Sequence, residues 1–243
     1  MILKIGIIGY GKMGKMLEQA STAKGHSVSW IANNSEELLE KLADNTADVA
    51  IEFSTPDSVL ISIQHCLNFN LPIVVGTTGW LKHLPEVSKQ VADANGSIIY
   101  ASNYSLTANL FFAMIEKAGQ WLSGFPDNYQ VAIEETHHTQ KLDKPSGTAL
   151  TMVDKFISNN GKYNSWQLVD DDNITQDIVP VTAHRIGDVV GDHSLKISTH
   201  MDELLIQHKA IDRMTFAEGA ILAATFIHNK KGIFTAKDLY PFN

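Results

Sequence analysis

Apolar and polar positions alternate regularly along residues 1–101 of the chain. Residues 3–8 are apolar apart from Lys4 and Gly6, which is typical of a buried parallel strand. The segment that follows, up to Gly25, carries its apolar residues at helical spacing. Further strands are predicted at 28–32, 48–53, 71–75 and 97–101, with helices at 36–43, 56–68 and 85–94 between them. This order predicts a parallel, doubly wound α/β sheet.

The pattern changes after residue 103. It predicts a long helix at 106–121, a strand at 129–134, a helix at 148–159 and a final apolar helix at 215–227 with little after it. Strand-like runs at 178–183, 194–199 and 203–210 suggest one antiparallel or mixed sheet. We therefore expect a Rossmann-like dinucleotide-binding domain at 1–104, to which 215–243 returns, and an α+β substrate domain with a mixed sheet at 105–214.

A glycine-rich loop follows the first strand directly and opens the first helix. Gly9 would permit the tight turn, Gly11 would let the backbone approach a pyrophosphate, and Gly14 would let the helix pack against the strand. The pyrophosphate would then lie at a helix N-terminus. The alternative is a tight turn without a ligand. The candidate cofactor residues here are Ile8, Gly9, Tyr10, Gly11, Lys12, Met13 and Gly14.

The residue that reads the adenosine ribose usually lies about 20 positions further on, at the end of the second strand. This chain has Asn33 and Asn34 there rather than an acid. A carboxylate would select the free 2′-hydroxyl, so its absence, with Lys12 in the loop, permits NADPH. Neither asparagine is a strong phosphate ligand, and we expect both NADPH and NADH to serve, with Asn33 as a contact. The alternative is that both asparagines only cap the next helix.

Two later strand ends are further candidates, because ligands in this architecture lie outside the carboxyl ends of strands. Small residues and amides there are suited to the nicotinamide ribose and carboxamide. The candidates are Gly76, Thr77, Thr78, Ala101, Ser102, Asn103 and Tyr104. Either segment could equally be an ordinary turn.

Residues 134–149 combine a proton donor, a cation and an anion site. His137 and His138 titrate near neutral pH, and Lys141 supplies a positive charge. Ser146, Gly147 and Thr148 begin a helix whose N–H groups favour an anion. We expect the intervening segment to be a loop, and the set is suited to protonating a small polycarboxylate.

Each of these residues also has a simpler interpretation. Adjacent histidines can be metal ligands, but no cysteine or HExxH spacing accompanies them, so we expect no metal. Ser146 could be only a helix cap and Lys141 only a surface charge, yet their joint occurrence favours a site. A second patch at 184–193 serves either the site or assembly, and Arg213 is suited to clamping a carboxylate.

Composition narrows the class of protein. With 243 residues and 44% hydrophobic content the chain can bury a full core, and a net charge of −8 argues against a general nucleic-acid or anionic-membrane binder. The one cysteine, Cys66, excludes an internal disulfide and a multi-cysteine metal site. There is no signal-peptide pattern and no apolar run of membrane-spanning length. We expect a cytoplasmic protein.

The sequence resembles the 4-hydroxy-tetrahydrodipicolinate reductase (dihydrodipicolinate reductase) family. The resemblance rests above all on the HHxxKxDxPSGTA pattern within 135–149, which is highly specific, and extends to 9–14, 76–79, 103–105, 185–193, 208–210 and 213–216. Two positions depart from the family pattern: 53–56 lack an arginine that many relatives carry, and Lys144 stands where alanine is usual. Lys144 has no assigned role.

The resemblance implies an NAD(P)H-dependent reduction in diaminopimelate–lysine biosynthesis, of 4-hydroxy-tetrahydrodipicolinate to tetrahydrodipicolinate. Hydride would come from the nicotinamide and the proton from His137, with Lys141 stabilising the anionic intermediate. The implied ligands of the substrate carboxylates are His138, Ser146, Gly147, Thr148 and Arg213. The resemblance also implies a homotetramer formed through the C-terminal sheet. The alternatives are a non-catalytic NAD(P)-binding sensor and a related oxidoreductase that acts on another small acid.

Overall fold

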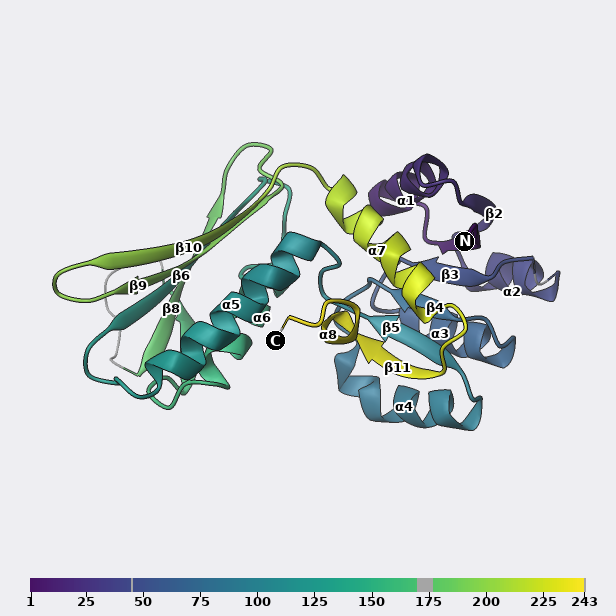
Figure 1. Cartoon of the computed structure of the whole chain (residues 1–243). Coiled ribbons are helices and arrows are strands. Elements are labelled where there is room, and N and C mark those ends of the chain that lie inside the picture. The colour runs from purple at the N-terminus through teal and green to yellow at the C-terminus, as the bar shows by residue number, and fades with distance from the viewer. Residues whose placement is uncertain (45, 170–176, 243) are drawn as a thin grey trace. The chain divides into compact units, whose positions relative to one another are not determined.

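The computed structural model describes residues 1–44, 46–169 and 177–242 (Figure 1). The chain forms two compact units. Unit 1 comprises Met1–Leu106 and Arg213–Asn243, and unit 2 comprises Thr107–Asp212. No helix among the described residues is both long and apolar enough to cross a membrane.

Unit 1 contains a six-stranded parallel sheet in the order β11-β5-β4-β3-β1-β2. Its strands are β1 (Lys4–Ile8), β2 (Ser27–Ala32), β3 (Val49–Glu52), β4 (Ile73–Val75), β5 (Ser97–Tyr100) and β11 (Gly232–Thr235). Its helices are α1 (Lys12–Ala23), α2 (Ser35–Ala43), α3 (Val59–Asn68), η1 (Leu81–His83), α4 (Leu84–Asp93), α7 (Met214–Ile227) and α8 (Ala236–Leu239).

Each face of this sheet carries its own apolar core. Helices α2, α3 and α4 pack on one face, where Leu38 and Ile63 meet Ala50. Helices α1 and α7 pack on the other, where Leu17 and Ile221 contribute (Figure 1). Side chains alternate between the faces along each strand, so these apolar strands are covered on both sides. The predicted doubly wound sheet is confirmed.

Unit 2 contains a five-stranded mixed sheet in the order β10-β9-β6-β8-β7. Its elements are α5 (Leu106–Leu122, whose first residue falls in unit 1), β6 (Gln130–His137), α6 (Gly147–Ile157), β7 (Ser165–Leu168), β8 (Ile178–Arg185), β9 (Gly191–Ser198) and β10 (Glu203–Ala210). Strand β6 is antiparallel to β9 and parallel to β8. The core lies where α5 and α6 pack on the sheet, with Phe111 and Phe156 against Ile133. The predicted mixed sheet is confirmed.

The structure corrects the pattern-based boundaries in three places. The chain adds β11 and α8 after α7, where little was expected, and β11 pairs with β5 at the sheet edge. Strand β7, which was not predicted, pairs with β8. Strand β6 runs on to His137, so that this histidine ends a strand and does not lie in a loop. The two unpredicted strands are four residues long and lack fully buried side chains, so neither has a strong apolar pattern.

Candidate functional site

The glycine-rich loop makes a tight turn between β1 and α1. Gly9 has a φ of +86°, and a Cβ there would lie 2.3 Å from the Phe53 carbonyl oxygen. A Cβ at Gly14 would lie 2.3 Å from the Gly9 carbonyl oxygen, so α1 packs closely on the turn. At Gly11, the N-cap of α1, a Cβ would meet no described atom within 4 Å. The loop is therefore open at Gly11, where the N–H groups of α1 begin.

The other predicted residues of this loop surround the turn. Ile8 ends β1, and Lys12 and Met13 begin α1. The Tyr10 hydroxyl donates a hydrogen bond to Glu18. These positions agree with a strand–turn–helix unit.

Asn33 and Asn34 have different roles at the end of β2. The Asn33 side-chain oxygen accepts a hydrogen bond from the Tyr10 N–H over 3.1 Å, which ties β2 to the glycine loop. Asn34 caps α2 by accepting a hydrogen bond from the Glu37 N–H over 2.9 Å. The Glu37 carboxylate accepts hydrogen bonds from the Asn33 N–H (2.8 Å) and the Asn34 side-chain amide (2.9 Å). The end of β2 has no acidic residue of its own, but Glu37 of helix α2 places a carboxylate there.

The segment after β4 is tied to the end of β3. The Thr77 hydroxyl donates a hydrogen bond to the buried Glu52 over 2.9 Å and accepts one from the Ser54 N–H over 2.8 Å. Burial raises the pKa of the Glu52 carboxyl. Gly76 follows β4 directly, and Thr78 is exposed. Neighbouring strand ends are therefore held together at one edge of the sheet.

The segment after β5 contains one residue whose side chain belongs to the core. Tyr104 is only 1% exposed, and its single hydroxyl proton is shared between the Val75 carbonyl at 2.9 Å and the Ile99 carbonyl at 3.1 Å. Ala101, Ser102 and Asn103 precede it, and the Asn103 side-chain oxygen accepts a hydrogen bond from the Ser105 N–H over 2.8 Å. The Tyr104 side chain therefore packs the interior, a role that the strand-end pattern did not distinguish.

In unit 2 the HHxxKxDxPSGTA residues lie between β6 and α6. The Ile186 N–H donates a hydrogen bond to the His137 carbonyl over 2.7 Å, and the Thr139 N–H donates to the Gly187 carbonyl over 3.1 Å. The Lys141 N–H donates to the His138 carbonyl over 3.2 Å. This segment is therefore held against the turn that follows β8.

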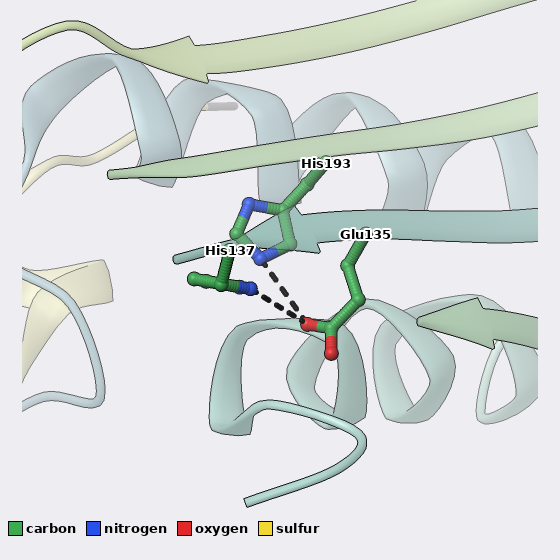
Figure 2. A group of neighbouring side chains, drawn as sticks. All are labelled: Glu135, His137 and His193. Atoms are coloured by element: carbon green, nitrogen blue, oxygen red, sulfur yellow. Dashed lines mark ion pairs between the residues drawn. The ribbon is translucent and has the colours of Figure 1, made fainter. Parts of the chain in front are cut away.

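A buried carboxylate lies beside the first histidine (Figure 2). Glu135 is two residues before His137 on β6, so their side chains share one face of the sheet. His193 pairs with Glu135 on the neighbouring strand β9. Glu135 Oε2 lies 3.4 Å from His137 Nδ1 and 3.7 Å from His193 Nε2. All three residues are less than 9% exposed, so solvent screens these charges little.

The second oxygen of the same carboxylate joins two other segments. Glu135 Oε1 accepts hydrogen bonds from the Ser146 N–H over 3.0 Å and from Arg185 Nη2 over 3.1 Å. Burial by itself raises the pKa of Glu135, but the nearby His193 imidazole, the hydrogen bond from Ser146 and the charge of His137 outweigh it and lower that pKa to about 2. Arg185 also donates hydrogen bonds to the Lys141 and Asp143 carbonyls. The Glu135 carboxylate is thus ionised at neutral pH.

The His137 imidazole is neutral at pH 7 in the ligand-free chain. Burial lowers its pKa, and the positive charges of His193, Lys141 and Arg185 add to this against the opposing effect of Glu135, so that the pKa is about 4. A ligand that brings negative charge next to this ring would raise the pKa. The site is therefore arranged to gain a proton together with an anionic ligand.

The predicted anion site lies at the N-terminus of α6. The Ser146 side chain caps the helix by accepting a hydrogen bond from the Ala149 N–H over 3.2 Å. Gly147 is exposed and Thr148 half-buried at the first two positions of the helix. Lys141 Nζ lies 2.7 Å from Asp143 Oδ1, and Lys144 is exposed.

The predicted catalytic and substrate-binding residues fall in both units, and the structure places four further residues beside those in unit 2. His137, His138, Lys141 and 146–148 lie in unit 2, whereas Arg213 is the N-cap of α7 in unit 1. The pattern did not single out Glu135, Arg185, Gly191 and His193. Glu135 had a signal, since Val131, Ile133, Glu135 and His137 alternate along β6. The other three come from the second patch at 184–193, which therefore contributes to this site.

Comparison with known proteins identifies relatives along nearly the whole chain. The family model for the N-terminus of dihydrodipicolinate reductase matches residues 3–104, and the model for its C-terminus matches 107–240. A 4-hydroxy-tetrahydrodipicolinate reductase from Christiangramia forsetii is 38% identical over 237 residues, covering 98% of this chain and 97% of the relative.

Solved structures share the fold. A dipicolinate-bound dihydrodipicolinate reductase from Paenisporosarcina sp. TG-14 has a TM-score of 0.71 at 21% identity, covering 97% of this chain and 98% of the other. A probable dehydrogenase from Thermotoga maritima has a TM-score of 0.61 at 9% identity, covering 98% of this chain and 93% of the other.

Proposed function

The chain belongs to the dihydrodipicolinate reductase family, and we propose that it reduces 4-hydroxy-tetrahydrodipicolinate to tetrahydrodipicolinate in diaminopimelate–lysine biosynthesis. The substrate, NAD(P)H and one proton give the product, NAD(P)⁺ and water. The observation that carries the proposal is the position of His137. It ends a strand beside an ionised Glu135, whose other oxygen binds the first residue of the anion site.

The substrate carboxylates bind at the start of α6. Unpaired N–H groups and the helix dipole favour negative charge there. Ser146, Gly147 and Thr148 form this seat, with His138 as a further ligand, and Arg213 of unit 1 stays a predicted ligand. The negative charge of a bound dicarboxylate raises the pKa of His137, so substrate binding itself favours protonation of the imidazole.

The reaction combines loss of water with two transfers. The hydroxyl group leaves the ring as water, a bound nicotinamide would supply hydride to the ring, and His137 would then donate a proton to the adjacent ring carbon. The Lys141 ammonium stabilises the anionic intermediate between them. The intermediate's charge is neutralised when the proton arrives, so a general acid beside a fixed cation is the arrangement that this step requires.

Both NADH and NADPH serve as the hydride source, and NADH is favoured. The glycine loop positions the pyrophosphate at α1, and the adenosine ribose then lies near the end of β2. The Glu37 carboxylate is held there by the Asn33 N–H and the Asn34 amide. A carboxylate accepts a hydrogen bond from a free 2′-hydroxyl and repels a 2′-phosphate. Lys12, which is exposed at the first position of α1, leaves NADPH usable.

The proposed assembly is a homotetramer. The proposed location of the enzyme is the cytoplasm. Leu205 on β10 is 56% exposed and points away from the face that α5 and α6 cover, as the neighbouring buried His208 and Ala210 indicate by alternation. Pairing of sheets between subunits would bury such a side chain. Sedimentation of the wild type and of Leu205→Lys tests this assembly: tetramers for the first and smaller species for the second support it, and a monomeric wild type overturns it.

A kinetic assay separates the reductase from a sensor that kept the fold and lost the reaction. Nicotinamide absorbance is followed with freshly prepared substrate and each cofactor in turn. Substrate-dependent oxidation supports the reductase. Cofactor binding without oxidation by either NADH or NADPH would favour the sensor.

A further inference from the structure

We propose that Glu135 and His193 are positioning residues that hold His137 as the tautomer with its proton on Nδ1. The transferred proton then leaves from Nε2. This assignment rests on the proposed function for its catalytic meaning, whereas the geometry on which it stands is that of the ligand-free chain. Neither residue touches substrate in this account.

The ring of His137 has three close neighbours. On one side its Nδ1 faces Glu135 Oε2 at 3.4 Å (Figure 2). The His193 ring packs against it at 73°, with 4.9 Å between the ring centroids. On the other side Gly191 lies close to His137 Nε2: a Cβ there would stand only 3.1 Å from this nitrogen, so glycine leaves room beside it. Glu135 and His193 therefore restrain the ring on the Nδ1 side, whereas the Nε2 side is left open by the missing side chain.

The carboxylate selects which ring nitrogen carries the resting proton. An ionised carboxylate only accepts hydrogen bonds, so it favours a proton on the nitrogen that faces it. Glu135 is kept ionised because its other oxygen accepts hydrogen bonds from Ser146 and Arg185. With Nδ1 protonated, Nε2 is the nitrogen that takes up a proton and gives it to the substrate.

His193 fixes the carboxylate in turn. Its Nε2 lies 3.7 Å from Glu135 Oε2 and 3.3 Å from the Ser146 hydroxyl. It also pairs with Glu135 across β6 and β9, and with His208 across β9 and β10. The imidazole therefore lies between the carboxylate and the cap of the anion site, so it aligns the proton donor with the place where the substrate binds.

A metal ion is the competing use of the same atoms. Nitrogen and oxygen atoms of Glu135, His137 and His193 lie within 4.8 Å of one another, and two histidines with a carboxylate are a known zinc set. However, the Glu135 carboxylate is already paired with the Arg185 guanidinium at 3.1 Å. The Lys141 ammonium is a second positive charge near His137. A divalent cation would be repelled by both, so we favour direct electrostatic pairing of Glu135 with the two imidazoles and make the metal an outcome of the test.

Nitrogen NMR of the imidazoles tests the tautomer without any need for activity. In the wild type near neutral pH we expect His137 to show a protonated Nδ1 and a bare Nε2. The opposite tautomer would overturn the proposal even if the enzyme reduces its substrate. A wild type that shows the expected tautomer but oxidises no cofactor would instead contradict the proposed function.

Two variants test the positioning role by the pH dependence of kcat. The titratable groups that face His137 are Glu135, His193, Lys141 and Arg185. Glu135→Gln removes the negative charge that raises the pKa of His137 and should move the alkaline limb of kcat to lower pH. His193→Gln removes the imidazole that lowers this pKa and should move the limb to higher pH. Both should lower kcat by ~10–100-fold with a small change in KM.

General structural damage would not move the two limbs in opposite directions. His200→Gln, at an exposed histidine of the same unit, serves as the matched control and should leave the profile unchanged. Limbs that do not move in either folded variant would overturn the proposal. Addition of Co²⁺ gives the remaining outcome: an absorption spectrum of tetrahedral cobalt that disappears in His193→Gln would overturn it in favour of a metal site.

Discussion

The backbone N–H of Ser146 donates a hydrogen bond to Glu135 Oε1 over 3.0 Å. The first residue of the anion site is thereby held by the same carboxylate that faces the His137 imidazole. One buried side chain therefore sets the distance between the proposed substrate-carboxylate site and the proposed proton donor.

Replacement of His137 by glutamine should remove the proton donor and leave the cofactor site intact. We expect His137→Gln to lower kcat by ~10²–10⁴-fold, the usual effect of losing a general acid. NADH affinity, measured by fluorescence titration, should stay close to that of the wild type. Wild-type turnover in this variant would end the assignment of His137.

A bound dicarboxylate should raise the pKa of His137. In the ligand-free chain this pKa is lowered to about 4, first by burial and then by neighbouring positive charges. A dicarboxylate such as dipicolinate at the start of α6 adds negative charge and should move the titration of the ring toward neutral pH. NMR titration of the imidazole with and without dipicolinate measures this. A pKa that stays unchanged at saturating ligand would show that the anion does not bind beside His137.

Stability should fall in acid because two buried groups resist protonation. The pKa of His137 is lowered from 6.5 to about 4, so below pH 6.5 the unfolded chain binds a proton that the folded chain does not. The free energy of unfolding therefore decreases as the pH falls through this range. The pKa of Glu135, lowered from 4.5 to about 2, extends the decrease to lower pH.

Urea unfolding at about pH 7 and about pH 5 checks this dependence. The wild type should lose more stability between the two than His137→Gln, because the variant lacks the titrating imidazole. Equal losses would mean that the pKa of His137 is not depressed in the folded chain.

Cofactor preference should respond to Glu37. Removal of its charge in Glu37→Gln should raise the ratio of kcat/KM for NADPH to that for NADH by roughly 5-fold, as expected for about 1 kcal/mol of repulsion at a partly exposed site. Glu36→Gln is the matched control, since Glu36 lies one residue earlier in the first turn of α2 and is exposed. An equal change in both variants would mean that only the net charge matters.

The sequence predicted the parts of the fold that have a strong local period. The buried strands of unit 1 are apolar on both faces, and each of its helices has one apolar stripe. These two patterns were enough to predict the doubly wound sheet. Strands β7 and β11 were missed because four half-exposed residues give no clear period. The extent of β6 was underestimated because Glu135 and His137 are polar residues on a buried face.

The candidate site was predicted as a list of residues but without its internal contacts. Glu135 and His193 are far apart in the chain, and only the register between β6 and β9 places them opposite each other. Arg185 reaches the same carboxylate through the pairing of β8 with β6. Strand register is a property of the whole sheet, so local pattern cannot supply it.

The path of the transferred hydride tests the central claim most directly. NADH that carries deuterium at both hydrogen positions of the reacting nicotinamide carbon is mixed with freshly prepared 4-hydroxy-tetrahydrodipicolinate and the wild type. We predict substrate-dependent loss of nicotinamide absorbance and one cofactor deuterium in the tetrahydrodipicolinate product. A product without that deuterium, or no oxidation of either NADH or NADPH, would contradict the account.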